Sequence, residues 1–429
     1  MENTAKNLKA FLDWSRSSYH AVDMLMRELD TVGYLRLSEG EKWELQPGGK
    51  YYMVRGGNAL IAFRIPQKVT GGFMISASHC DRPTFKVKEN GTLTGKYTRL
   101  ATEKYGGMLM STWLDRPLSI AGRVLVETEN GIKTRLLNVD SDLLLIPSVA
   151  IHMNRNANEG YAWNPAVDTL PLVGSETAAD KLRALLEKEA GGKILGHDLY
   201  LYVRQEATVW GFEEEYISAQ GLDDLQCVWG CTQGFLAAGE SEAIPVLAVF
   251  DSEEVGSSSV QGAGSTLLSD VLARICEARD LDLPCMLSYS FMVSADNAHA
   301  LHPNHPEYSD ANNAPLPGGG VVLKFNANQR YTTDGMSAAI FRKICEKADV
   351  PVQTYYNRAD LPGGSTLGCI SLGHVSVLSA DIGLAQLAMH SAYETASTRD
   401  SVYLEQAMKA YYETSLAESD PLSGTVLAK

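Results

Sequence analysis

The sequence lacks the features that mark disulfide-stabilised and membrane-spanning proteins. Its seven cysteines are an odd number without a C-x-x-C pair, which is typical of reduced, mostly buried thiols rather than of a disulfide framework. No apolar run approaches the roughly 18 residues that a transmembrane helix requires, and residues 1–12 lack the basic and apolar regions of a secretion signal. We therefore expect a cytoplasmic protein without a membrane segment.

Positive charge is also scarce: 37 Lys and Arg residues stand against 52 Asp and Glu residues, and the formal net charge is −15. No cluster of Lys or Arg overrides this excess, so neither nucleic acid nor an anionic membrane is expected as a partner. The 429 residues, 45% of them hydrophobic, predict a globular protein of about two to three domains.

Three short apolar segments are each followed by a histidine or a carboxylate. These are 73–78 before His79 and Asp81, 244–250 before Glu253 and Glu254, and 286–295 before Asp296. Such runs are typical of buried parallel strands, whose carboxyl ends open into the crevice where α/β proteins bind ligands. Asp223, in an Asp-Asp pair, and His390 are two further candidates.

Helical and strand-like segments alternate over most of the chain. We expect two helices within 4–32, a hairpin of 51–54 and 59–63, helices over 222–239, 267–280 and 333–349, and strands over 244–250, 286–295, 320–325 and 374–378. This alternation predicts an α/β fold in which helices sandwich the sheet.

The region from residue 89 to residue 212 has a different character. Short strand-like pieces alternate there with turns and with the loop 153–160. Apart from His152, no histidine or acid follows a strand in this region. We interpret it as an inserted second domain.

The candidate ligands His79, Asp223, Glu254, Asp296 and His390 suit zinc, cobalt or manganese better than magnesium, because imidazole is combined with carboxylate. If one carboxylate bridges, each of two ions receives one histidine, one terminal acid and a shared acid. A metal pair polarises a carbonyl and supplies the attacking hydroxide.

Two further acids have natural roles around such a metal pair. One of the adjacent Glu253 and Glu254 can bind metal while the other accepts the proton of the water. Asp81 is placed to fix the second imidazole nitrogen of His79. A solvated surface pair and a structural histidine are the competing interpretations, and the residues alone leave the choice open.

Eight blocks resemble the M18 family of metallo-aminopeptidases, the aspartyl aminopeptidases, over nearly the whole chain. They are Ser18-Tyr19-His20-Ala21-Val22, Ser78-His79-Cys80-Asp81, 150–155, Leu222-Asp223-Asp224-Leu225, 251–257, 294–300, 324–331 and Leu387-Ala388-Met389-His390-Ser391. The resemblance implies a catalytic domain of aminopeptidase type, formed by 1–90 and 212–429 as a mixed sheet between helices. It also implies a β-rich dimerisation domain over 91–211 and a homo-oligomer, typically a dodecamer built from dimers.

The resemblance also implies a role for each candidate residue. The implied ligands are His79 and Asp296 for one metal ion, Glu254 and His390 for the other, and Asp223 as the bridge; zinc is the expected metal, with manganese or cobalt as alternatives. Glu253 is the implied general base. His152, reaching a neighbouring subunit, Lys324 and Tyr331 are the implied substrate contacts.

The expected reaction is removal of an acidic N-terminal residue from a peptide. Because the whole chain is acidic, selectivity must come from a local cation; Lys324 is the best candidate, with Arg330, Arg358 and the turn 363–366 as possible neighbours. A broader aminopeptidase for neutral residues and a non-catalytic peptide-binding assembly are the alternatives.

The chain departs from the family pattern at two positions beside the implied metals. Asp224 stands where asparagine is common, and Arg82 where serine is usual, which weakens the substrate assignment. The run His299, His302 and His305 has the spacing of a zinc site, but Pro303 and Pro306 favour a loop.

Overall fold

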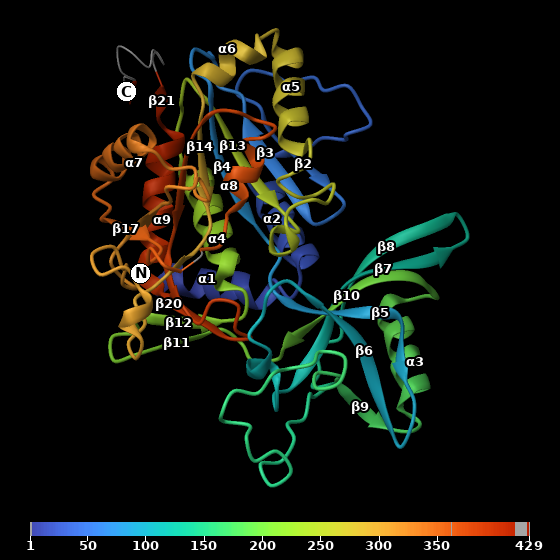
Figure 1. The fold of residues 1–429 in the computed structure, drawn as a ribbon. Helices are drawn as coiled ribbons and strands as arrows, with labels where there is room; N and C mark the ends of the chain where they lie inside the picture. Colours follow the sequence, from blue (N-terminus) through green and yellow to red (C-terminus); the bar gives the residue numbers. More distant parts are fainter. Residues whose placement is uncertain (1, 362, 417–426, 429) are drawn as a thin grey trace.

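A nine-stranded mixed sheet forms the centre of the computed structural model, which describes residues 2–361, 363–416 and 427–428 (Figure 1). In spatial order its strands are β1 (Leu35–Arg36), β2 (Lys50–Arg55), β3 (Ala59–Arg64), β13 (Ile244–Phe250), β4 (Phe73–His79), β14 (Phe291–Ala295), β18 (Leu378–Gly383), β16 (Val321–Phe325) and β17 (Val352–Tyr356). The adjacent strands β13, β4 and β14 run parallel. Their carboxyl ends therefore meet at one edge of the sheet.

Helices cover both faces of this sheet, as the alternation of elements predicts. One core contains residues of α1 (Glu2–Trp14), α2 (Ser18–Thr31), α4 (Leu222–Ala237), α7 (Gly335–Lys347) and α9 (Thr398–Tyr412); the other contains residues of α5 (Leu267–Arg279), α6 (Leu283–Ser288) and α8 (Leu367–Ser371). Successive residues of β13 alternate between these cores: Leu247 and Val249 join the first, Val246 and Ala248 the second. Burial on both faces explains why β13 is apolar throughout.

A second, six-stranded antiparallel sheet has its own hydrophobic core. Its strands are β8 (Gly131–Asn138), β7 (Leu118–Thr128), β10 (Ile194–Val203), β5 (Thr84–Leu93), β6 (Tyr97–Tyr105) and β9 (Leu172–Ser175), accompanied by η1 (Met110–Trp113) and α3 (Ala178–Ala190). These strands run from residue 84 to residue 203, so the sheet begins before the predicted boundary at 91 and ends before 211.

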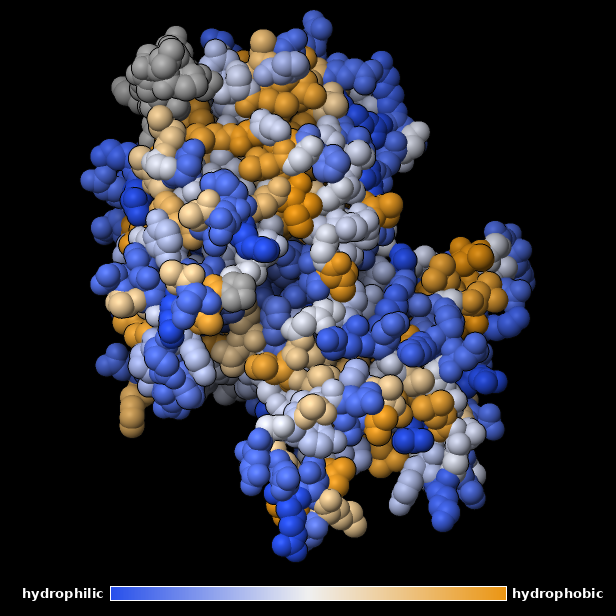
Figure 2. Space-filling model, viewed as in Figure 1, coloured by the Kyte–Doolittle hydropathy of each residue, from blue (hydrophilic) through white to orange (hydrophobic). Residues whose placement is uncertain are grey.

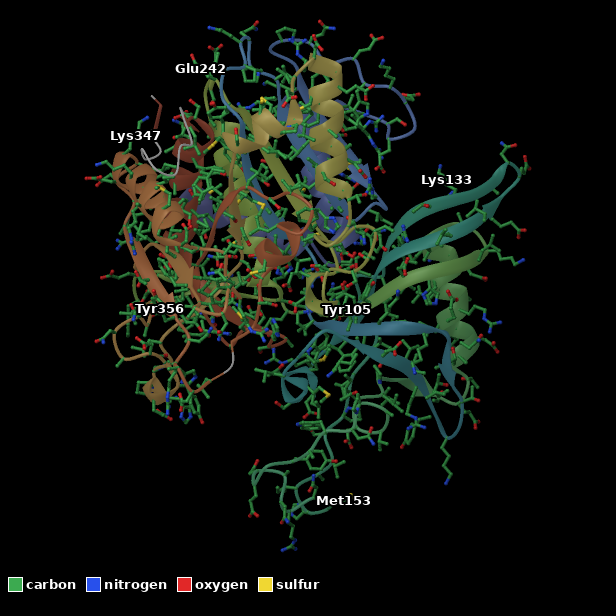
Figure 3. The ribbon with its side chains drawn as sticks, turned by 45° about the horizontal axis from the view of Figure 1, so that its top comes forward. Tyr105, Lys133, Met153, Glu242, Lys347 and Tyr356 are labelled. Atoms are coloured by element: carbon green, nitrogen blue, oxygen red, sulfur yellow. The ribbon has the colours of Figure 1, made fainter. Side chains whose placement is uncertain are left out.

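The second sheet projects from the main body (Figure 1). Tyr105 lies where the two parts meet, and Met153 lies at the tip of a long loop that points away (Figure 3). Hydrophobic side chains gather on the arm of β7 and β8 (Figure 2), where Ile132 is 66% exposed.

Two smaller sheets complete the fold. One contains β11 (Thr208–Trp210), β12 (Tyr216–Ala219), β20 (Glu394–Ser397), β19 (Ala385–Leu387) and β15 (Ala298–His299); the other contains β21 (Ser415–Leu416) and β22 (Leu427–Ala428). Short 3₁₀ turns lie at η2 (Glu253–Val255) and η3 (Pro306–Tyr308). None of the described helices has the length and hydrophobicity needed to span a bilayer.

Two predicted strands differ from the structure. Residues 286–288, the start of the predicted strand 286–295, instead belong to helix α6, because Asp282 accepts a hydrogen bond from the Cys285 amide and Pro284 occupies the first turn. The predicted strand 374–378 begins only at Leu378, since the amides of His374 and Val375 bond to Ser371. The seven cysteines are all free, as predicted.

Candidate metal centre

The carboxyl edge of the central strands carries most of the predicted ligands. His79 is the last residue of β4, Asp296 directly follows β14, and Glu254 lies in the turn after β13. The parallel register pairs Phe250 with His79, so the ends of β13 and β4 are level. Hydrophobic burial of the strands thus delivers three polar groups to one place.

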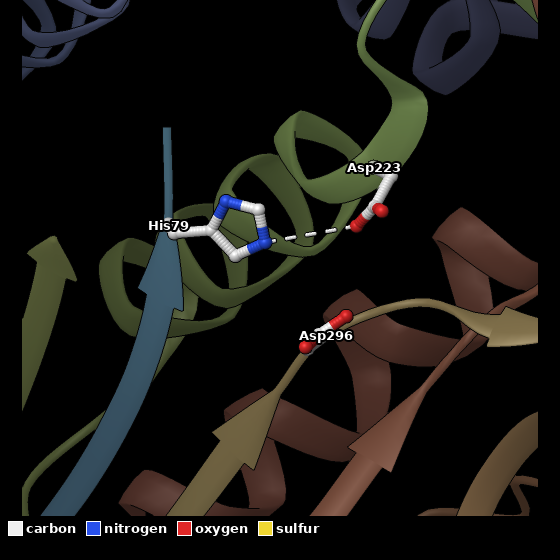
Figure 4. A group of neighbouring side chains, drawn as sticks. All are labelled: His79, Asp223 and Asp296. Atoms are coloured by element: carbon white, nitrogen blue, oxygen red, sulfur yellow. Dashed lines mark ion pairs between the residues drawn. The ribbon is translucent and has the colours of Figure 1, made fainter. Parts of the chain in front are cut away.

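Asp223, in the first turn of α4, lies between the two histidines. His79 Nε2 is 3.6 Å from Asp223 Oδ1 (Figure 4), and His390 Nε2 is 3.2 Å from Asp223 Oδ2. His390 Nε2 also lies 3.3 Å from Glu254 Oε2. The chain therefore brings all its predicted ligands into one cluster around a shared carboxylate.

This cluster contains two overlapping groups with the geometry of metal sites. The first is His79, Asp223 and Asp296, and the second is Asp223, Glu254 and His390; within each group the donor atoms lie within 4.8 Å of one another. Asp223 is common to both. Two imidazoles and three carboxylates form the nitrogen and oxygen donor set that zinc accepts.

Unpaired buried oxygens indicate that the cluster fits cations. Asp223 Oδ1, Asp224 Oδ1 and Glu254 Oε1 are buried without a hydrogen-bond donor. Burial, together with the charge of Asp223, raises the pKa of Glu254, and burial also raises the pKa of Asp296. Bound metal ions would coordinate the unpaired carboxylate oxygens and would offset the repulsion between the neighbouring carboxylates.

Glu253 points into the site cavity but belongs to neither metal group. Burial raises the pKa of its carboxyl to about 7. A group with a pKa near neutrality can both accept and return a proton at the pH of a cell. Glu253 is therefore the carboxyl to which the predicted role of general base is assigned below.

Asp81 holds the acid pair and His79 in place. Its carboxylate accepts hydrogen bonds from the backbone amides of Glu253 and Glu254, both at 3.1 Å. It also accepts one from the Tyr105 hydroxyl at 2.7 Å, and Asp81 Oδ1 lies 3.4 Å from His79 Nδ1. Asp81 thus acts on the cluster by fixing its orientation.

Sequence reasoning missed two residues that support the same cluster. Glu394 is 1% exposed and accepts hydrogen bonds from the amides of Asp223, at 3.1 Å, and His390, at 2.7 Å. Tyr105 reaches Asp81 from the second sheet. The contact of Glu394 with Asp223 spans 171 positions and that of Tyr105 with Asp81 spans 24, and no local sequence pattern marks either residue.

The site cavity has a volume of about 170 Å³. Its lining includes Glu253, Lys324, Tyr331, His299 and the segment 364–366. His299 was not predicted as a site residue, because its run with His302 and His305 indicated a loop. Among the described residues, neither it nor the exposed His302 and His305 belongs to a metal group.

Lys324 is the only lysine or arginine among the described residues that line this cavity. Its Nζ donates to the carbonyls of Asp296, at 2.9 Å, and Asn297, at 3.1 Å, and lies 5.0 Å from the centre of the Tyr331 ring. Burial would lower the pKa of the ammonium, but the charge of Asp296 raises it above its usual value. Lys324 is therefore a fixed cation with two of its three N–H groups engaged.

Tyr331 and residues 364–366 line the cavity as predicted contacts, whereas three other predicted contacts lie outside it. His152 is exposed on the long loop next to Met153 and does not line the site cavity of its own chain. Arg330 and Arg358 do not line it either, and Arg358 pairs with Asp360 at 2.8 Å.

Comparison with known proteins places this arrangement in one family. The family model described as aminopeptidase I zinc metalloprotease (M18) matches residues 11–412. A probable M18 family aminopeptidase 2 of Clostridium novyi (strain NT) is 41% identical over 96% of this chain and 100% of its own length.

Solved structures of similar proteins support the same family assignment. Ape4, determined by cryo-electron microscopy in complex with Nbr1, aligns with a TM-score of 0.93 and 34% identity over 96% of this chain and 86% of its own. The mApe1 dodecamer of S. cerevisiae aligns with a TM-score of 0.85 and 26% identity over 95% of this chain and 96% of its own. The predicted fold class and family are confirmed: the chain belongs to the M18 family and is a metallo-aminopeptidase.

Proposed function

We propose that this enzyme uses two divalent metal ions, most suitably zinc, to remove acidic residues from the N-termini of peptides. The observation that carries the two-metal proposal is the pair of ligand groups that share Asp223. His79 and Asp296 would complete one site, and Glu254 and His390 the other. When bound, such a pair polarises the scissile carbonyl and acidifies the attacking water.

The protein groups supply the proton transfers and the positioning. Glu253 accepts the proton of the attacking water and delivers it to the departing amine, because its carboxyl lines the cavity and belongs to neither ligand group. Asp81 keeps Glu253 and Glu254 at fixed positions through their amides. Glu394 does the same for Asp223 and His390.

Selectivity for an acidic residue would rest on Lys324, with Tyr331 and His299 forming the neighbouring wall. The Lys324 ammonium lies 3.7 Å from Asp296 Oδ1, and its third N–H group, which makes no hydrogen bond, would face a substrate carboxylate; burial strengthens that attraction. The two carbonyl contacts of Lys324 favour a second candidate, in which the ammonium only stabilises Asp296 and the enzyme prefers neutral residues.

A homo-oligomer, built from dimers into a dodecamer, is the proposed assembly. The S. cerevisiae mApe1 to which the chain is similar is a dodecamer, and the exposed Ile132, Val149 and Met153 lie in the second domain. His152 would then reach the site of a neighbouring subunit. The mass of the enzyme measured in solution tests the proposed assembly. The seven free cysteines are consistent with the proposed cytoplasmic location.

Substrate preference is tested with two short peptides that differ only in an N-terminal Asp or Leu. The zinc-, manganese- or cobalt-loaded enzyme should have a higher kcat/KM for the Asp peptide. Lys324→Met should reduce this ratio at least ~10-fold, the scale of one lost charge-assisted contact, whereas the exposed Lys343→Met should leave it unchanged. A preference for Leu in the wild type would discard the acidic pocket, and no release from either peptide would favour a peptide-binding assembly.

A further inference from the structure

Asp381 is a carboxylate inside the central sheet that the proposed reaction does not use. It lies within β18 and is 0% exposed. The nine described strands of this sheet contain no other Asp or Glu. Because a buried carboxylate is costly unless its oxygens accept hydrogen bonds, the contacts of Asp381 show what it holds in place.

Both oxygens of Asp381 accept hydrogen bonds from outside its own strand. Oδ2 accepts from the amide of Thr332 and, at 2.7 Å, from its hydroxyl, and Oδ1 accepts from the Thr366 hydroxyl. The Asp381 amide donates to the Thr333 hydroxyl at 2.8 Å. Thr332 and Thr333 lie between β16 and α7, and Thr366 directly precedes α8. Asp381 therefore ties two separate segments of the chain to β18.

These two segments form walls of the site cavity. Tyr331, the neighbour of Thr332, lines the cavity, and so do residues 364–366. Leu323 of β16 pairs with Ile382 of β18, so Lys324 and Asp381 are the next residues along these neighbouring strands. The carboxylate thus bonds to both walls beside the cation of the cavity.

Tight packing keeps α8 against the Asp381 carboxylate. Ser294 of β14 pairs with Asp381 across the sheet, and Gly368 of α8 lies close to both. A Cβ at Gly368 would lie 2.7 Å from Ser294 Cβ and 3.2 Å from Asp381 Oδ1. Since non-bonded carbon atoms normally stay about 3.5–4.0 Å apart, only glycine allows this approach. The hydrogen bond of Thr366 to Asp381 is therefore reinforced by the packing of the helix that follows it.

We propose that Asp381 is a positioning residue for substrate binding. Through Thr332 it holds Tyr331, and through Thr366 it holds the segment 364–366, in the walls that face the N-terminal side chain of the peptide. These are the walls of the pocket proposed above, so this role rests on the proposed function.

The groups that perform the chemistry have supports of their own. Asp81 binds the amides of Glu253 and Glu254, and Glu394 binds those of Asp223 and His390. Loss of Asp381 should therefore weaken substrate binding more than it slows the chemical step, which raises KM more than it lowers kcat.

Asp381→Asn tests this role, because it removes the charge and one acceptor oxygen while keeping the shape of the side chain. KM should rise about 10-fold, the scale of one lost hydrogen bond to a charged group. The metal content, measured by elemental analysis, should equal that of the wild type. A wild-type KM in the folded, metal-loaded variant would overturn the proposal, as would a loss confined to kcat.

Two variants of Thr332 give a test that does not require Asp381→Asn to fold. Thr332→Val removes the hydroxyl that bonds to Asp381 and should raise KM, whereas Thr332→Ser keeps a hydroxyl and should restore the wild-type value. Thr414→Val is the matched control, since Thr414 is also buried and its hydroxyl donates to the Ala410 carbonyl at 2.8 Å. It should lower Tm and leave KM unchanged. Equal KM values for Thr332→Val and Thr414→Val would overturn the proposal.

The choice of peptide separates failure of this role from failure of the proposed selectivity. Each KM is measured with whichever of the Asp and Leu peptides the wild type prefers. A wild-type preference for Leu would discard the acidic pocket, and the KM values for the Leu peptide would still decide whether Asp381 positions the walls. A preference for Asp with unchanged KM values in the variants would keep the acidic pocket and discard the role of Asp381.

Discussion

The two large sheets of this molecule differ in how deeply their strands are buried, and that difference decides where chemistry occurs. All seven residues of β13 are buried, whereas a single residue of β8 is. In the buried strands β13, β4 and β14, charged or ligating side chains occur only at or just after the strand ends, where His79, Glu254 and Asp296 gather. The second sheet keeps solvent on one side and contributes to the cluster through Tyr105 at its edge.

The largest expected effect is on kcat and comes from Glu253, the acid after strand β13 that is not a proposed metal ligand. Glu253→Gln should lower kcat at least ~10²-fold, because the amide cannot accept the proton of water. Metal content and Tm should stay near wild type, measured by elemental analysis and calorimetry. Glu213→Gln, an exposed acid outside the cluster, is the matched control, and near-normal activity of Glu253→Gln would refute the proposed role.

The second sheet's contribution is tested by Tyr105→Phe, which removes one hydroxyl and keeps the ring. Asp81 then loses a hydrogen bond, and metal affinity or activity should fall about 10–100-fold, as for other groups that orient ligands. Chelator competition measures affinity and peptide release measures activity. Tyr97→Phe, in the same strand and 65% exposed, should change neither; an unchanged Tyr105→Phe would leave the second sheet without influence on the site.

These two residues also show how far the sequence alone predicts the site. Glu253 was predictable because an acid directly after a fully apolar strand is a local pattern. Tyr105 and Glu394 were not, since these ordinary strand residues contact Asp81 and Asp223, each more than 20 positions away in the sequence. The helix at 283–288 was missed for a different reason. The cap that Asp282 provides at the helix N-terminus outweighs the strand-like composition of the residues that follow it.

A smaller effect is expected at His20 of α2, which is buried and lies near the charges of Arg82 and Arg16. Its pKa is about 4 in the folded chain and about 6.5 when unfolded. The unfolded chain therefore binds the extra proton first, and stability is lost as the pH falls from 6.5 toward 4. At pH 5 the loss is about 2 kcal/mol.

Denaturant unfolding of the wild type and of His20→Gln at pH 7.5 and pH 5 measures this loss. The wild type should lose about 2 kcal/mol more than the variant between the two pH values. His305→Gln, at an exposed position, should behave as the wild type. Identical pH profiles for wild type and His20→Gln would show that the histidine is not kept neutral by its surroundings.

The smallest expected effect is on stability and comes from Asp198, which connects the second sheet to the catalytic part at a distance from the proposed metal ligands. Its carboxylate accepts from Lys86 at 2.7 Å and Arg123 at 2.8 Å within the second sheet, and from the Tyr19 hydroxyl of α2 at 3.3 Å. Because the side chain is 22% exposed, solvent screens these contacts, and Asp198→Asn should lower the free energy of unfolding by about 1 kcal/mol. Its kcat and metal affinity should equal those of the wild type, since Asp198 does not contact Asp81 or any ligand. A drop in metal affinity as large as that of Tyr105→Phe would instead show that the position of the whole second sheet, rather than one hydroxyl, governs the metal centre.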